Sequence, residues 1–192
     1  MIDAMFTKLE SERIILRRFR DSDIEPFYSY RADPDVARYQ DWENYTLDEA
    51  KRFLEVMRSR HPGTPGEWFQ FALQVKATSN MIGDCGLLTL QEEAKQAVLG
   101  ITIATKHQGK GYAMEAVTCL LDYVFSSLGM HRVRAITDCK NTRSISLLER
   151  VGMRREGHFL QNVWFKGAWG DEYSYAILRS EWTSRAKGHQ QG

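Results

Sequence analysis

The stretch of residues 101–115 constrains this chain more than any other. A β-branched run ends at Ala104 and is followed by two closely spaced glycines, Gly109 and Gly111. Apolar residues then recur every three or four positions from Ala113 to Leu128, which is the spacing of one face of an α-helix. The stretch therefore predicts a strand, a glycine-rich turn and a helix. Such a turn directs several backbone N–H groups toward one point at the positive end of a helix, so it predicts an anion site whose usual occupant is phosphate.

The turn differs from two familiar phosphate loops. It has no G-x-x-x-x-G-K-[ST] pattern, which excludes a P-loop, and it lacks the third glycine of the dinucleotide fingerprint. It does contain Q-x-x-G-x-A, running from Gln108 through Gly111 to Ala113. This hexapeptide resembles the pyrophosphate loop of the GNAT superfamily of acyl-CoA-dependent N-acyltransferases. A plain strand-to-helix turn that uses glycines for positive φ is the alternative.

The composition is that of a single globular domain. The chain has 192 residues, which predicts one domain over 1–183 and a polar, frayed tail over 184–192. The net charge of +1 gives no reason to expect a nucleic acid or an acidic membrane as partner. The three cysteines are scattered without a C-x-x-C pair, so we expect no metal site and no disulfide framework. The N-terminal residues lack the apolar core of a signal peptide, and no stretch approaches eighteen apolar residues, which favours a cytoplasmic protein with no membrane partner.

Periodicity and turn residues predict the order of the elements. Thr46 and Glu49 form a capping box that starts one helix, and Gly152 is placed to end another. The strand over 69–76 alternates apolar and polar residues and is expected to be half-buried, whereas Gly83 and Gly86 indicate a bend or bulge in the next strand. We expect strands at 13–17, 69–76, 81–90, 97–103, 133–138, 157–165 and 172–178, helices at 21–31, 47–57, 113–128 and 141–150, and a hairpin loop at 166–170.

This order resembles the GNAT fold over nearly the whole chain. Residues 141–153 resemble the second signature of the superfamily, a short helix beside the coenzyme. The opening around residues 16–19 and 33–42, and the ending around 156–157 and 170–175, are similar to the branch of ribosomal-protein N-terminal alanine acetyltransferases. The resemblance implies an α+β, three-layer fold. A central mixed, mostly antiparallel sheet has helices on both faces and a splay between the coenzyme strand, 97–103, and the parallel strand 133–138.

The resemblance also implies where acetyl-CoA, the co-substrate, is bound. Unpaired backbone groups in the splay would meet the pantetheine amides, the N–H groups of the glycine turn would hold the pyrophosphate, and the short helix would face the pantetheine. Asn141 is either such a contact, a helix cap, or both. Lys110 is either an ionic contact or an exposed, solvated lysine. The expected coenzyme residues are Ile101, Thr102, Ile103, Gln108, Gly109, Lys110, Gly111, Tyr112, Ala113, Asn141 and Ser144.

The sequence departs from the superfamily at two catalytic positions. A tyrosine on the short helix often serves as general acid, and the matching residue here is Leu148. Many relatives of this branch carry a glutamate where this chain has Leu99. Ser144, Tyr173 and Tyr175 remain candidate acids and Asp138 a candidate base, each with a structural role as the alternative. A site that works mainly by positioning and desolvation is also open.

Residues 35–45 are expected to form an aromatic loop or a short helix, and the acceptor pocket is expected between them and the 162–171 hairpin. Tyr39, Trp42, Trp164 and Trp169 would form its aromatic walls, with core or interface packing as the alternative. The first hypothesis is an N-acetyltransferase acting on a protein N-terminus or peptide amine. The second is the same chemistry on a small amine such as an antibiotic, a polyamine or an amino acid, and the third is a weakly catalytic acyl-CoA-binding module. The aromatic-rich final hairpin also suggests a homodimer.

Overall fold

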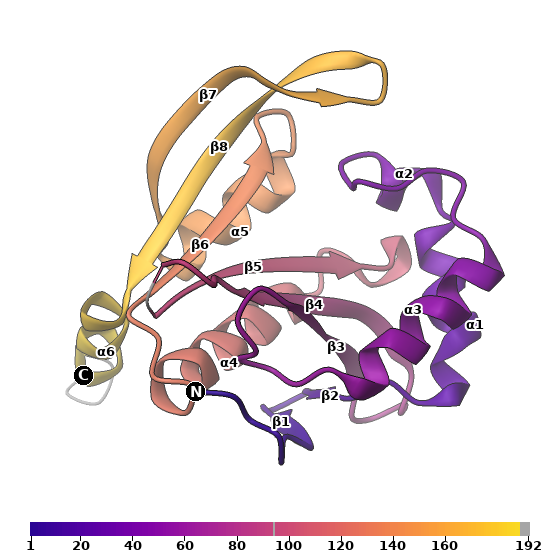
Figure 1. The fold of residues 1–192 in the computed structure, drawn as a ribbon, viewed down its shortest axis with the longest axis horizontal. Helices are drawn as coiled ribbons and strands as arrows, with labels where there is room; N and C mark the ends of the chain where they lie inside the picture. The colour runs from indigo at the N-terminus through magenta and orange to yellow at the C-terminus, as the bar shows by residue number, and fades with distance from the viewer. Residues whose placement is uncertain (94, 189–192) are drawn as a thin grey trace.

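The fold is built on one continuous mixed sheet (Figure 1). The computed structural model describes residues 1–93 and 95–188. Within this part of the chain, eight strands pair in the order β1-β2-β3-β4-β5-β6-β8-β7. All neighbouring pairs are antiparallel except β5 with β6, as predicted. The strands are β1 Lys8–Glu10, β2 Ile14–Arg17, β3 Trp68–Val75, β4 Met81–Thr89, β5 Gln96–Ile103, β6 Arg132–Asp138, β7 Arg154–Phe165 and β8 Ala168–Leu178.

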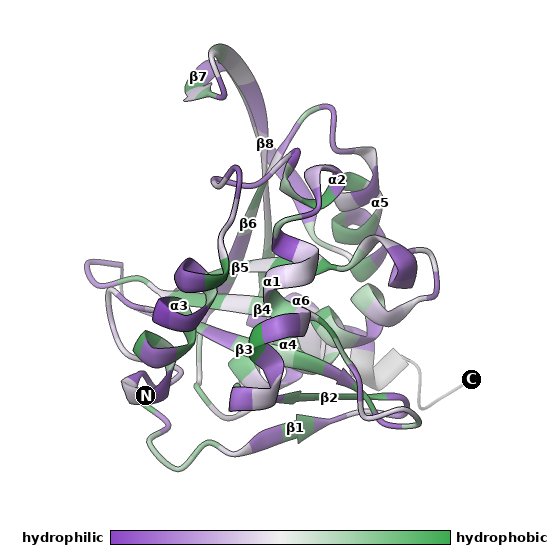
Figure 2. Ribbon diagram, turned by 90° about the vertical axis from the view of Figure 1, so that its right-hand side faces the viewer, coloured by the Kyte–Doolittle hydropathy of each residue, from purple (hydrophilic) through white to green (hydrophobic). Residues whose placement is uncertain are grey.

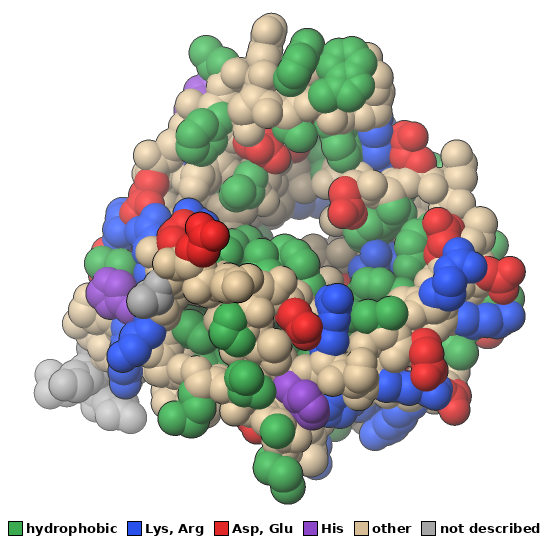
Figure 3. Space-filling view, in the orientation of Figure 1, with side chains coloured by type: hydrophobic (Ala, Val, Ile, Leu, Met, Phe, Trp, Pro, Cys, Tyr) green, Lys and Arg blue, Asp and Glu red, His purple; other side chains and the backbone are tan. Residues whose placement is uncertain are grey.

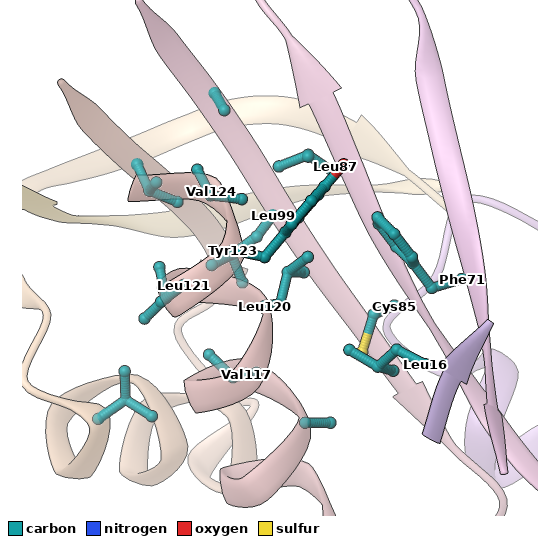
Figure 4. Packing of buried hydrophobic residues seen from close by; sticks show 14 of the residues in the cluster. Leu16, Phe71, Cys85, Leu87, Leu99, Val117, Leu120, Leu121, Tyr123 and Val124 are labelled. Atoms are coloured by element: carbon teal, nitrogen blue, oxygen red, sulfur yellow. The ribbon is translucent and has the colours of Figure 1, made fainter. Parts of the chain in front are cut away.

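Helices cover both faces of the sheet and enclose two hydrophobic clusters. α1 and α3 pack against one face around Phe27 and Leu54. On the other face α4 packs through Val117, Leu120 and Val124 against strand residues (Figure 4). α5 adds to the same cluster. The helices are α1 Ile24–Arg31, α2 Pro34–Ala37, α3 Leu47–Ser59, α4 Tyr112–Ser126, α5 Thr142–Val151 and α6 Arg179–Gly188, with 3₁₀ turns at Asp21–Asp23 and Thr105–His107.

The local signals in the sequence start and stop these helices. The side chains and backbones of Thr46 and Glu49 form the predicted capping box of α3. Gly152 ends α5 with φ +94°, the left-handed conformation that suits glycine. The predicted irregularity near Gly83 is also present, because the β3–β4 register shifts beside it and a Cβ on Gly83 would lie 2.1 Å from the carbonyl oxygen of Thr102.

Some elements of the structure differ from the expected ones in burial or in their bounds. β3 is not half-buried but buried along nearly its whole length, because helices cover both of its faces. The edge strand β1 carries no clear periodic signal over so few residues, whereas α2 overlaps the stretch 35–45, where a loop or a short helix is expected. The hairpin loop is shorter than 166–170, because β8 already begins at Ala168. The predicted tail boundary at residue 184 falls inside α6, and residues 189–192 lie outside the described part of the chain.

The sheet opens between its two parallel strands. β5 and β6 pair at only three positions, from Gln96↔Arg132 to Val98↔Arg134, and then diverge. Beyond that point β5 stays paired with β4 and β6 with β8. The predicted splay is therefore present, and each of its strands turns one row of backbone groups toward the gap. Past the gap, β7 and β8 continue as a long hairpin beyond the end of β6 (Figures 1 and 2), and at its tip Lys166 Nζ donates to the Ala37 carbonyl of α2 at 2.6 Å. We call residues 158–172 of these two strands the β7–β8 arm.

Candidate active site

A cavity of about 770 Å³ occupies the gap between β5 and β6. Its walls are the second half of β5, the 105–113 loop with the start of α4, the end of β6, the first turns of α5, α2 with the residues after it, and one face of the β7–β8 arm. In the space-filling view the surface is hollowed between the arm and the body of the molecule (Figure 3). The cavity thus joins a helix N-terminus, an open strand edge and a hollow surface.

The open edge of β5 presents the main chain of alternate residues. The N–H of Ala104 donates to the carbonyl of Ile82 in β4 at 2.9 Å, whereas the carbonyl of Ile103 accepts from Gln108 Nε2 at 2.8 Å on the side of the gap. Because hydrogen-bonding directions alternate along a strand, Ile101 also faces the gap. Thr102 lines the cavity, but its main chain faces β4, so the expectation of an unpaired backbone there is wrong.

The glycine turn leaves the N-terminus of α4 without a side-chain cap. Gly109 and Gly111 have φ +74° and +84°, and Gly111 is the N-cap residue. A glycine suits this left-handed backbone because it has no Cβ to clash. The first N–H groups of a helix have no intrahelical partner and carry partial positive charge, so this uncapped end suits an anion. Gln108, Gly109, Gly111, Tyr112 and Ala113 line the cavity, whereas Lys110 does not.

Gln108 ties the glycine turn to the neighbouring elements. Its side-chain N–H group reaches the carbonyl of Ile103, and its side-chain oxygen accepts from Arg143 of α5. His107 also lines the cavity. Burial, with the nearby Lys106 and Lys110, lowers the pKa of His107. Its imidazole is therefore neutral at pH 7 and adds no full positive charge to this end of the cavity.

The first turn of α5 brings two predicted coenzyme residues to the wall. The Asn141 side-chain oxygen accepts from the Ser144 N–H at 3.1 Å, which is helix capping, and both residues line the cavity. Leu148 lies one turn further along and also lines it, although it is only 2% exposed. Leu99 of β5 is 4% exposed. The two positions at which the sequence departs from its relatives thus place apolar side chains in the cavity wall.

Two carboxylates face the cavity beyond the splay. Asp138 ends β6, and Glu172 is its direct partner in the β6–β8 ladder. Asp138 Oδ1 accepts from the backbone N–H of Lys140 at 2.6 Å, and Glu172 Oε2 accepts from Asn162 Nδ2 at 2.6 Å. Neutral groups donate both hydrogen bonds, so neither bond cancels the carboxylate charge. Sequence reasoning missed Glu172, whose position opposite Asp138 depends on strand pairing.

Tyr173 and Tyr175 lie away from this cavity. Side chains alternate along a strand, so both point to the face of β8 opposite Glu172. Tyr175 is fully buried; its hydroxyl donates to Glu149 Oε1 at 2.9 Å and accepts from Arg155 Nε at 3.0 Å. Burial raises the pKa of Tyr175; the hydrogen bond from Arg155 opposes this shift, and the bond to Glu149 adds to it. The ring centroid of Tyr173 lies 3.9 Å from the Arg155 guanidinium carbon. Both tyrosines therefore pack on the face of β8 on which α5 and Arg155 lie.

One of the four predicted aromatic wall residues lines the cavity. Tyr39 does so and donates from its hydroxyl to the Lys140 carbonyl at 3.2 Å. Trp42 lies outside the cavity. Its indole N–H donates to the Arg31 carbonyl at 3.0 Å, and its ring stacks on the Arg31 guanidinium group.

The tryptophans of the arm point away from the cavity. Trp164 and Trp169 are 62% and 58% exposed, with ring centroids 5.4 Å apart. Val163 and Phe165 line the cavity instead, because neighbouring strand residues face opposite sides. The period of two along the hairpin is the signal that could have located them.

Comparison with known proteins identifies the family of this site. A family model described as an acetyltransferase (GNAT) domain matches residues 13–154. The chain belongs to the GNAT acetyltransferase family. An uncharacterized N-acetyltransferase, p20 of Bacillus licheniformis, is 31% identical over 175 residues, which cover 91% of this chain and 97% of that protein. A GNAT-family acetyltransferase structure from Bacillus anthracis superposes with a TM-score of 0.81 at 29% identity and covers 91% of this chain and 100% of its own.

Other relatives of this GNAT enzyme differ in the acceptors named for them. The spermidine N(1)-acetyltransferase of Vibrio cholerae is 26% identical, over 92% of this chain and 99% of that one. The ribosomal protein uS5-alanine N-acetyltransferase of Escherichia coli is 27% identical, over 92% and 93%. A spermidine N-acetyltransferase structure from V. cholerae in complex with CoA and spermine has a TM-score of 0.78 at 24% identity, over 90% and 99% of the two chains.

The GNAT assignment makes this protein an N-acetyltransferase, as the sequence motifs predicted. In the V. cholerae structure, a protein of this fold holds CoA and spermine. Among the described residues, no helix is long and apolar enough to cross a membrane, and no group of three or more His, Cys, Asp or Glu residues is placed to hold a metal ion.

Proposed function

We propose that this enzyme moves the acetyl group of acetyl-CoA to a primary amine at the N-terminus of a protein or peptide. The observation that carries the proposal is the continuity of the cavity. It runs from the uncapped N-terminus of α4, along the open edge of β5, to the hollow beneath the β7–β8 arm. A donor with an anionic end and an extended amide-bearing chain fits the first two parts, and an acceptor can enter from the third.

The coenzyme is proposed to lie along the main chain. The N–H groups of Gly109 to Ala113 would hold the pyrophosphate, whose charge suits the positive end of a helix. The pantetheine amides would pair with Ile101 in the gap, as an added strand pairs with a sheet edge. Ser144 and Asn141 would face that chain from α5. This arrangement would place the thioester near Ile103, whose N–H is directed into the gap and could stabilise the tetrahedral oxyanion.

The proposed chemistry is direct attack of a neutral amine on the thioester carbon. An amine nitrogen forms the new C–N bond, loses its extra proton, and expels the CoA thiolate. Asp138 is the proposed acceptor of that proton, because it lies at the acceptor side of the cavity. Ser144 is the proposed donor of a hydrogen bond to the leaving sulfur. Leu99 and Leu148 would make the surroundings apolar, which favours the neutral form of the amine.

A peptide acceptor is supported by an exposed apolar side chain in the cavity wall. Ile136 of β6 lines the cavity on the side of Asp138 and is 55% exposed. An extended chain that leaves the cavity over β6 would cover this side chain. The similarity to the uS5-alanine acetyltransferase agrees with this choice.

A polyamine is the second candidate acceptor. Asp138 and Glu172 are paired carboxylates at the same end of the cavity, and like charges opposite each other on a ladder repel. An ammonium group lying between them would relieve this repulsion. The similarity to spermidine N(1)-acetyltransferase agrees with this alternative.

Thiol release with acetyl-CoA and a matched panel tests both acceptors. The panel pairs peptides that begin with alanine or serine with the same peptides blocked at the N-terminus, and adds spermidine and spermine. Turnover of the free peptides alone, with the mass of one acetyl group added to the first residue, supports the first proposal. Turnover of the polyamines alone replaces it with the second. CoA binding with no turnover of any amine would instead favour the weakly catalytic module.

A further inference from the structure

The outer side of the glycine turn is held by an arginine from the other end of the chain. Arg13 lies between β1 and β2, and its Nη1 donates to the carbonyl of Lys110 at 3.1 Å. Its guanidinium carbon lies 5.0 Å from the centroid of the Tyr112 ring. A Cβ on Gly111 would lie 3.1 Å from Arg13 Nη2. Arg13 therefore packs against the back of the turn.

Glu115 fixes this arginine in place. Arg13 Nε donates to Glu115 Oε2 at 2.7 Å, while the Arg13 backbone N–H and Ser11 Oγ both donate to Oε1 at 2.6 Å. Burial raises the pKa of Glu115, but the hydrogen bonds from Ser11 and Arg13 outweigh it and lower the pKa overall. Glu115 is in the first turn of α4, where its own N–H donates to the Gly111 carbonyl at 3.1 Å. The carboxylate thus joins the helix to the arginine.

The contact with Lys110 determines the direction of the next N–H. In a trans peptide the C=O and the N–H point in opposite directions. The Lys110 carbonyl points out of the turn toward Arg13, so the Gly111 N–H on the same peptide points away from Arg13. Gly109 and Gly111 line the cavity whereas Lys110 does not, so this N–H is directed to the cavity side.

We propose that Arg13 is a positioning residue of the coenzyme site. Together with Glu115 it holds the Lys110–Gly111 peptide so that the Gly111 N–H faces the coenzyme pyrophosphate. The side chain of Arg13 does not line the coenzyme cavity, so it acts through the turn rather than on the ligand. The inference rests on the proposed placement of the pyrophosphate at this turn.

Calorimetric titration with two probes tests this role. CoA carries the pyrophosphate, and pantetheine is the same chain without it. We expect Arg13→Ala to weaken CoA about five- to tenfold and to leave the affinity for pantetheine within about twofold. Arg58→Ala is the matched control. It removes an exposed arginine that is ion-paired with Asp21 on a distant surface, and it should change neither affinity.

Two further variants separate positioning from charge. Arg13→Lys keeps the charge but loses the planar fork that bonds Lys110 and Glu115 at once. It should therefore bind CoA nearly as poorly as Arg13→Ala. Combining Arg13→Ala with Glu115→Ala should cost little more than either change alone, because the two side chains act as a unit.

Some results would contradict the role of Arg13, and a different result would contradict the coenzyme site itself. Full CoA affinity in Arg13→Lys would mean that charge alone matters, and equal weakening of CoA and pantetheine would mean general damage. An affinity of Arg13→Ala equal to that of Arg58→Ala would remove the role of Arg13. If Arg13→Ala does not fold, Arg13→Lys decides by the same criteria. Absence of CoA binding by the wild-type protein would instead contradict the coenzyme site itself.

Discussion

The positive φ of Gly111 gives a quantitative test of the glycine turn. At φ +84° a residue with a Cβ costs roughly 1–2 kcal/mol, unless its backbone changes to negative φ. Gly111 is exposed, so the free turn of a Gly111→Ala variant can relax to negative φ. Coenzyme binding must then restore the strained conformation. The Kd for CoA should therefore rise by about 5- to 30-fold, since about 1.4 kcal/mol corresponds to a factor of ten.

Backbone strain at a glycine should weaken coenzyme binding only where that glycine lies in the coenzyme site, and a second glycine serves as the control. Gly129 follows α4 with φ +66°, and a Cβ there would meet nothing within 4 Å. It does not line the cavity. Gly129→Ala should therefore lower Tm by about 2–8 °C for the same roughly 1–2 kcal/mol, with no change in the Kd for CoA. Gly111→Ala should show the converse pattern.

Calorimetry and thermal melts on three variants complete the test. Gly111→Asn adds a Cβ at the same place but tolerates the left-handed region better, so its Kd should lie between those of wild type and Gly111→Ala. Equal losses for the alanine and asparagine variants would implicate the contact with Arg13 rather than the backbone. If Gly111→Ala binds CoA as wild type does and its Tm is unchanged, the assignment of the pyrophosphate to this turn is refuted.

Four other predictions follow from the site and the surface. Ser144→Ala should lower kcat only mildly and leave the Kd for CoA near wild type, since a thiol with a pKa of about 8.5 leaves readily without a strong acid. An unchanged kcat in steady-state kinetics would remove Ser144 from the chemistry. Asp138→Asn should reduce kcat/KM by roughly 10²–10⁴ with little effect on CoA affinity, and a loss under tenfold would exclude it as general base. Hydrogen bonds from Arg132 lower the pKa of Glu156 to about 2, so the ionised carboxylate stabilises the fold above its ordinary pKa of 4.5, and this stabilisation is lost as the pH falls toward 2. Glu156→Gln should therefore lower Tm by about 1–4 °C at pH 7, which corresponds to a loss of roughly 0.5–1 kcal/mol. The difference in Tm should become progressively smaller below pH 4.5. The proposed homodimer should give twice 22.2 kDa in light scattering, and a mass near 22.2 kDa at micromolar concentration would count against it.

The sequence by itself determined the elements that depend on nearby residues. The capping box at Thr46 and Glu49, the glycines that start α4 and end α5, and the helical period of 113–128 all act within a few positions of the chain. Their order, with the motifs at Gln108 and Asn141, was enough to predict the sheet, its splay and the family.

Only the tertiary structure decided which side chains meet. Glu172 joins Asp138 because β6 and β8 pair at one register, and the same pairing puts Tyr173 and Tyr175 on the opposite face. Trp164 points out while Phe165 lines the cavity, a difference set by one step along a strand. Arg13 reaches the glycine turn across 97 positions of sequence. Local sequence patterns do not predict such contacts, because strand register and helix packing depend on the free energy of the whole sheet rather than on any one segment.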